Sequence, residues 1–274
     1  MRDFYNLDNY HYGKSSKKAY NRGKSFGYQI LGFGSGVAGG PSFLPYQRGG
    51  FYFGAVNTTN LVSTSGVISA DVTQVGTART APGGCGFGFD KGIIAKGYTG
   101  VEPANYTAIS NLVSNVGVMA TDTTGIDPVI GQCGAAQIGG DKGINCFGQN
   151  NGGKVNTKNL ISNTGVVAAV AAGGGSAMSY IGCTSYSAEN DKAIICFGDG
   201  SDLNQSNLIS NTGVIAADGT GVGTAKFSPA AQTYGGDKAI CAYGGAGTSL
   251  DAPSNLISNL GVVAADVSKV GTGR

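Results

Sequence analysis

The chain has 274 residues, of which 49 are glycine, 41% are hydrophobic and 12% are charged, with one histidine and no tryptophan. Glycine at this density without a triplet period excludes collagen, and the hydrophobic share excludes a wholly disordered chain. Residues 1–25 carry six basic and two acidic side chains, whereas the remainder carries 12 basic and 14 acidic ones. We therefore expect a turn-rich all-β protein in which a basic arm precedes a weakly acidic body.

The N-terminal arm, residues 1–25, interleaves aromatic and cationic side chains. These are Phe4, Tyr5, Tyr10, Tyr12, Lys14, Lys17, Lys18, Tyr20, Arg22 and Lys24. A segment this polar cannot bury enough apolar surface to fold alone, so we expect it to order in a groove of a partner protein. An ordinary disordered tail is the alternative. The glycine-rich segment 27–36 resembles the second strand of a later unit, which predicts an extra strand at the seam of the fold or against another subunit.

Residues 26–274 are expected to form one repeat domain. The motif Asn-Leu-(Val/Ile)-Ser recurs in steps of 51, 48, 48 and 48 residues, each time followed by Gly-Val. It begins at Asn60, Asn111, Asn159, Asn207 and Asn255. This period divides the chain into units of roughly 42–79, 80–127, 128–178, 179–226 and 227–274. We interpret the five asparagines as equivalent structural residues that bond the backbone at a strand entry, with a sugar-ligand role as the alternative.

Each unit contains short apolar runs that alternate with glycine turns. In the fifth unit the predicted strands are 228–234, 238–244, 255–259 and 261–266, with a hairpin turn at Gly235 and Gly236. Four antiparallel strands in 40–50 residues are typical of a propeller blade. Four units carry an Asp-Lys pair at this hairpin: Asp90-Lys91, Asp141-Lys142, Asp191-Lys192 and Asp237-Lys238. The pairs are either turn residues with a solvated lysine or a ring of charges on one face.

The sequence of the repeat unit resembles the repeats of the kelch family of β-propellers. The resemblance rests on the segments 192–200 (KAIICFGDG) and 207–218 (NLISNTGVIAAD) and on the glycine pair Gly244-Gly245. It implies a five-bladed kelch-like β-propeller of four-stranded repeats of about 48 residues, preceded by an extended arm. Over residues 42–274 the repeat also resembles repeats of bacteriophage proteins, cyanophages above all, which implies a virion protein.

Six cysteines occupy repeat-related places. Cys133 and Cys146 are 13 residues apart, as are Cys183 and Cys196, and the midpoint of each pair falls in a predicted hairpin turn. Each pair is either a cross-strand disulfide or a set of small buried hydrophobic residues. Cys85 and Cys241 have no evident partner. No Cys-x-x-Cys motif occurs and His11 is the only imidazole, so no metal site is expected.

The motifs of common enzyme classes are absent from the sequence. The Gly-Lys-Ser triplets at Gly13 and Gly23 lack the first glycine of a phosphate-binding loop, and a Ser-His-Asp set would need His11, in the arm. We expect no catalytic residue and no cofactor. No apolar run is as long as a membrane span, and no signal peptide is evident, so we expect neither membrane insertion nor export by the general secretory route.

These observations predict a non-enzymatic structural protein of a phage virion. It would be made in the bacterial cytoplasm, present in several copies, and located in the tail, fibre or baseplate in preference to the head. The arm would bind other virion proteins, and the loops would bind a host surface glycan or receptor. No nucleic-acid partner is expected. Alternatives are a capsid decoration protein and a lectin-like or filament-forming bacterial surface protein.

Overall fold

The structure is a computed structural model that describes residues 49–52, 57–100, 105–198, 203–246, 253–268 and 270–271. The chain divides into two compact units, Met1–Pro45 and Tyr46–Arg274, and every described residue belongs to the second. The predicted arm at 1–25 and the predicted extra strand at 27–36 lie outside the described residues. Within the described part, no helix has the length and apolar character needed to cross a membrane.

Strands account for all the regular elements of the described residues, which confirms the all-β prediction. They are β1 (Gly49–Tyr52), β2 (Thr58–Val62), β3 (Val72–Thr73), β4 (Gly83–Phe87), β5 (Lys91–Ala95), β6 (Ser110–Val113), β7 (Gly134–Ile138), β8 (Lys142–Asn150), β9 (Gly153–Ile161), β10 (Ala171–Ala172), β11 (Gly182–Tyr186), β12 (Lys192–Gly198), β13 (Leu203–Ile209), β14 (Ala230–Tyr234), β15 (Lys238–Ala242), β16 (Ser254–Ile257) and β17 (Val263–Val267).

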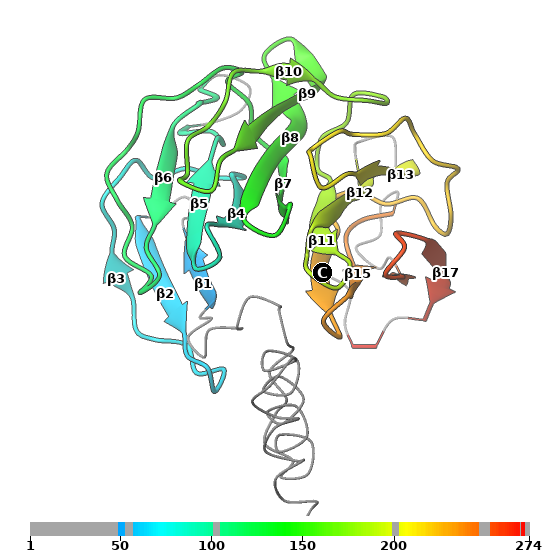
Figure 1. The fold of residues 1–274 in the computed structure, drawn as a ribbon. Coiled ribbons are helices and arrows are strands. Elements are labelled where there is room, and N and C mark those ends of the chain that lie inside the picture. Colours follow the sequence, from blue (N-terminus) through cyan, green and yellow to red (C-terminus); the bar gives the residue numbers. More distant parts are fainter. Residues whose placement is uncertain are drawn as a thin grey trace, which may run out of the picture. The chain divides into compact units, whose positions relative to one another are not determined.

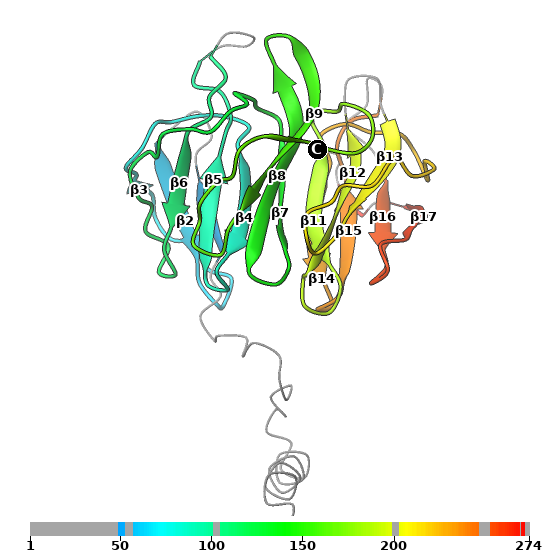
Figure 2. The ribbon, with the colours of Figure 1, turned by 45° about the horizontal axis from the view of Figure 1, so that its top comes forward.

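The strands form five small antiparallel sheets that follow one another along the chain (Figure 1). We call them the first (β1–β3), second (β4–β6), third (β7–β10), fourth (β11–β13) and fifth (β14–β17) sheets. Each sheet lies within one sequence repeat. The inner strands of the last four sheets are β4, β7, β11 and β14, and each contacts the next (Figure 2).

The five repeat asparagines occupy one place, on the third strand of each repeat opposite the second. Asn111 pairs with Ile94 and Asn207 with Ile195, and Asn60 pairs with Phe51 of β1. Strand β1 therefore corresponds to the second strand of the later sheets. Residues before Gly49 lie outside the described residues.

The predicted fourth strand of each repeat is regular in only part of the structure. The third and fifth sheets contain it as β10 and β17, and the first sheet as β3. In the second and fourth sheets the corresponding segment makes only isolated bridges, such as Val113 to Met119 and Ile209 to Ile215.

The hydrophobic core is divided among the junctions between neighbouring sheets. Ile144 and Phe147 of the third sheet pack with Ile195 and Ile209 of the fourth, and all four are fully buried. Other clusters of the same kind lie at the second-to-third and fourth-to-fifth junctions. A sheet buried on both faces needs a continuous apolar strand rather than an alternating one. This explains why β12 reads Lys-Ala-Ile-Ile-Cys-Phe-Gly with every residue after Lys192 buried.

A bulge interrupts the pairing of the long second strands β8 and β12. The pairing of β8 with β9 shifts between Cys146 and Gly148, and Phe147 between them has a φ of 56°. A Cβ on Gly148 would lie 2.7 Å from the carbonyl oxygen of Gly131, so only glycine fits beside the inner strand. The same bulge recurs between Cys196 and Gly198.

Candidate functional site at the two ends of the sheets

Each repeat asparagine bonds a backbone carbonyl nine residues later in its own repeat. In the fourth repeat the Asn207 amide donates to the carbonyl oxygen of Ala216 at 3.1 Å and to Oδ1 of Asp218 at 2.9 Å. Asn60, Asn111 and Asn255 make the same two bonds to the residues nine and eleven positions later. Asn159 donates to the carbonyl oxygens of Ala168 and Asp127. These side-chain amides therefore hold the scaffold together.

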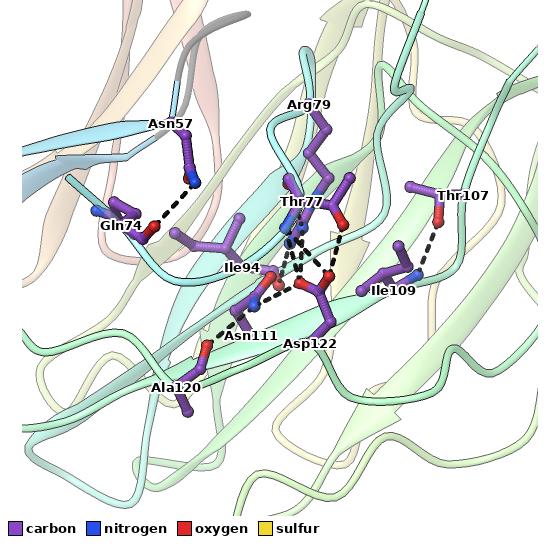
Figure 3. Close-up of polar contacts among 10 residues, drawn as sticks. All are labelled: Asn57, Gln74, Thr77, Arg79, Ile94, Thr107, Ile109, Asn111, Ala120 and Asp122. Atoms are coloured by element: carbon purple, nitrogen blue, oxygen red, sulfur yellow. Dashed lines mark hydrogen bonds and ion pairs between the residues drawn. The ribbon is translucent and has the colours of Figure 1, made fainter.

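In the second, fourth and fifth repeats an aspartate eleven residues after the asparagine joins the repeat to the preceding one. The Asp218 carboxylate accepts bonds from the Ser176 backbone N–H at 3.0 and 3.1 Å and from the Ser176 hydroxyl at 2.7 Å. We call this arrangement the latch. It recurs as Asp122 with Thr77 and as Asp266 with Thr224. Figure 3 shows the Asp122 latch, with Asn111 and Arg79 directed at the same carboxylate.

The latch carboxylates are held ionised. Burial alone would raise the pKa of Asp122, but hydrogen bonds from Thr77 and Asn111 and the charge of Arg79 outweigh it and lower the pKa. Burial lowers the pKa of Arg79 itself, to about 10.

The latch was not predicted from the sequence. The signal was the aspartate eleven residues after four of the five asparagines, at Asp71, Asp122, Asp218 and Asp266.

The end of the sheets that carries the Asp-Lys hairpins has the same ion pair in three repeats. At Lys91, Lys142 and Lys238 the ammonium pairs with the adjacent aspartate at 2.9–3.1 Å and remains about half exposed. Backbone bonds also link neighbouring hairpins around the series. They run from Gly88 N–H to the Asp141 carbonyl, from Gly139 to Asp191 and from Ser187 to Asp237.

The same end exposes one valine from every repeat. These are Val67, Val118, Val166, Val214 and Val262, with exposed fractions of 60–65%. Each valine follows a glycine with positive φ in a tight turn. In each turn the hydroxyl of the serine four residues before the valine accepts a hydrogen bond from the valine N–H. Asn115 and Asn163 of these turns reach Asp90 and Asp141 of the hairpins, which places valines and lysines at one end. We call this end the turn end; it lies at the bottom of Figure 2.

The opposite end, which we call the loop end, differs from repeat to repeat. The connections between the second and third strands have 5, 14, 2, 4 and 11 residues, from the first repeat to the fifth. In the third repeat β8 and β9 extend as a long hairpin, seen at the top of Figure 2. In the second repeat Tyr98 and Tyr106 pack edge to face, with ring centroids 6.0 Å apart.

A hollow of about 230 Å³ lies where the inner strands begin, at the loop end. Equivalent residue pairs from four repeats line it: Ala81-Pro82, Gln132-Cys133, Tyr180-Ile181 and Ser228-Pro229. Backbone bonds connect these pairs in sequence. Gln132 N–H donates to the Ala81 carbonyl, Tyr180 to Gln132, and Ser228 to Tyr180. The Gln132 amide also donates to the Tyr180 hydroxyl at 2.8 Å.

The structure does not bring the expected disulfide partners together, and all six cysteines are free. Cys183 pairs with Ile195, while Cys196 pairs with Gly182, so the two thiols lie on opposite faces of the fourth sheet. Cys133 and Cys146 are offset in the same way, because Cys146 pairs with Gly134. A spacing of 13 residues is one residue away from a directly facing pair, and one residue reverses the face of a strand.

The described residues contain no group of three or more His, Cys, Asp and Glu side chains that could hold a metal ion. The aromatic and basic residues of the predicted arm lie outside the described residues. No protein-family model matches the chain, and no curated protein is detectably similar to it.

Proposed function

We propose that the chain is a non-enzymatic scaffold and binding protein whose loop end recognises a ligand. One observation carries the proposal: the two ends of the same repeats differ in kind. The turn end repeats its valine in all five units and its hairpin lysine in four, and equivalent backbone bonds link the hairpins of the second to fifth units, whereas the connections at the loop end range from 2 to 14 residues. Variable loops on a rigid repeated frame are the usual arrangement of a recognition surface.

We further propose that the five sheets are blades of a β-propeller. The support is that equivalent bonds and clusters join each described sheet to the next. Only the outer faces at the two ends of the series depart from this pattern. Tyr234 of the fifth sheet is 39% exposed, whereas its equivalents Phe87, Ile138 and Tyr186 are 1–3% exposed. At the other end Ile68 of the first repeat is 57% exposed.

The extra strand predicted at 27–36 is the proposed closing element between these two end faces. Exposed apolar faces at the ends of a repeat array require a cap or closure. The proposal predicts that the Tyr234 side chain is protected from solvent in the full chain. Tyrosine nitration mapped by mass spectrometry tests this: Tyr234 modified as readily as tyrosine in the unfolded chain would exclude closure.

The resemblance of the repeat to phage proteins supports a location on the virion, in the tail, fibre or baseplate. In this proposal the arm at 1–25 attaches the protein to neighbouring virion proteins, in several copies. The loop end then contacts a host surface glycan or receptor. Deleting residues 1–25 is expected to leave a folded protein that no longer enters the particle. Incorporation of the shortened protein at the normal level would move the attachment surface to the sheets.

An array of bacterial surface polysaccharides probed with the labelled full-length protein tests the binding role. The loop-end triple variant Thr99→Ala, Asn151→Ala and Lys154→Ala is expected to weaken binding at least tenfold, about 1.4 kcal/mol. The matched turn-end variant replaces three exposed valines with serine, at Val118, Val166 and Val214, and is expected to bind within twofold of the unmodified protein. The reverse pattern would assign recognition to the turn end, and no binding by the unmodified protein would exclude a polysaccharide ligand.

A further inference from the structure

The cysteines of this protein face the junctions between sheets. Cys196 on β12 of the fourth sheet and Cys241 on β15 of the fifth are both fully buried, and their sulfur atoms are 2.7 Å apart. Gly182 of β11 lies beside both: a Cβ there would be 2.9 Å from the Cys241 sulfur and 3.2 Å from the Cys196 sulfur. Glycine at this position leaves the space that the two thiols occupy.

A bonded pair of sulfurs requires only a small further approach. A disulfide has an S–S distance of about 2.05 Å, so the two sulfurs of Cys196 and Cys241 need to move by less than about 1 Å. The two residues are 45 positions apart in sequence, so a bond between them would close a long loop. Cross-links that close long loops restrict the unfolded chain most.

We propose that Cys196 and Cys241 form a disulfide that joins the fourth sheet to the fifth when the protein meets a low-molecular-weight disulfide such as oxidised glutathione. One cysteine thiolate attacks a sulfur of oxidised glutathione and displaces one glutathione thiolate, giving a mixed disulfide. The second cysteine thiolate then attacks the protein sulfur of that mixed disulfide and displaces the second glutathione. The net reaction oxidises two protein thiols and reduces one oxidised glutathione to two glutathione molecules, with one proton leaving each thiol.

The packed junction controls the rate of this reaction. The neighbouring Cys241 thiol and burial both raise the pKa of Cys196, so little thiolate exists while the sheets are closed. Attack therefore needs a transient opening between the fourth and fifth sheets. Once formed, the bond holds that junction shut, independently of what the loop end binds.

The experiment compares the native full-length protein with protein refolded from urea, each equilibrated with a high ratio of oxidised to reduced glutathione. Free thiols are then alkylated and the unreduced protein is digested with trypsin. Cleavage after lysine places Cys196 in the peptide 193–226 and Cys241 in the peptide 239–269. We expect these two peptides to appear joined, with a mass equal to their sum less two hydrogens, and the oxidised protein to melt roughly 5–10 °C higher.

Two variants control the assignment. Cys241→Ser is expected to lose both the joined peptides and the rise in melting temperature. Cys85→Ala removes a thiol of the second sheet and is expected to keep both. Six alkylated cysteines in refolded, fully equilibrated protein would overturn the proposal. A joined pair of peptides 159–192 and 193–226 would also overturn it, because it would place the bond between Cys183 and Cys196.

Discussion

Replacing Asp218 with alanine tests the latch between the third and fourth repeats. The change removes the bonds from the Ser176 N–H and hydroxyl and the 2.9 Å bond from the Asn207 amide. Bonds to an ionised acceptor contribute about 1.5–3 kcal/mol each when buried, but Asp218 is only half-buried and water replaces part of them. We therefore expect a total loss of roughly 2 kcal/mol in the free energy of unfolding, measured by urea titration with far-UV circular dichroism.

Asp71→Ala is the matched control. Asp71 stands at the same repeat position, but the bond it accepts comes from Asn60 of its own repeat, at an exposed site. We expect a loss of about 0.5 kcal/mol or less. Equal losses in Asp71→Ala and Asp218→Ala would refute the idea that the carboxylate joins consecutive repeats.

The contribution of Asp218 should also depend on pH. Burial raises its pKa, but the bonds from Asn207 and Ser176 outweigh burial and lower it overall. The latch therefore stabilises the fold above the pKa of an unfolded aspartate, about 3.9, and this stabilisation disappears as the pH falls through the lowered folded pKa. The stability difference between the unmodified protein and Asp218→Ala should be constant above pH 5 and should shrink below pH 4. A difference that persists undiminished at pH 2 would contradict this explanation.

Three further substitutions test the packing. Lys226→Met should lower the free energy of unfolding by roughly 1–3 kcal/mol, because the buried ammonium donates to the Pro253 carbonyl and to Asn255 Oδ1, although Met178 fills the equivalent place one repeat earlier; urea titration checks this, and an unchanged free energy of unfolding would contradict it. Gly213→Ala should destabilise by about 1–3 kcal/mol, because φ is +79° and the added Cβ would overlap the Leu160 side chain; an unchanged melting temperature would show that the turn is not tight. Burial lowers the pKa of Lys96 to about 8. Between pH 8 and the pKa of an unfolded lysine, about 10.4, the unfolded chain therefore binds a proton that the folded chain has lost. The free energy of unfolding rises with pH across this range. In urea titrations across that pH range, Lys96→Met should lack this rise in stability. Identical pH profiles for Lys96→Met and the unmodified protein would contradict this explanation.

Much of the repeat was predictable from sequence, because duplication aligns the same turn and strand residues five times. The strands predicted at 228–234 and 238–244 correspond to β14 and β15, and glycine turns delimit both. The asparagine position was found for the same reason. These features depend on local spacing, which a single chain displays directly.

The contacts between repeats were not predictable in the same way. The partner of Asp218 is Ser176, 42 residues earlier, and no local pattern joins them. The cysteine pairing failed for a different reason. Period-two alternation means that an error of one residue in the hairpin moves Cys196 to the other face of the sheet, toward Cys241 of the next sheet. Register at the hairpin therefore decided which thiols meet.

The central claim, that the loop end binds and the turn end supports, is tested most directly by hydrogen–deuterium exchange of the full-length protein. The exchange is measured by mass spectrometry with and without the strongest polysaccharide found on the array. We expect slower exchange in peptides that cover residues 96–109 and 148–154, with no change at the turns around Val166 and Val214. Protection confined to those valine turns, with the connecting loops unchanged, would contradict it.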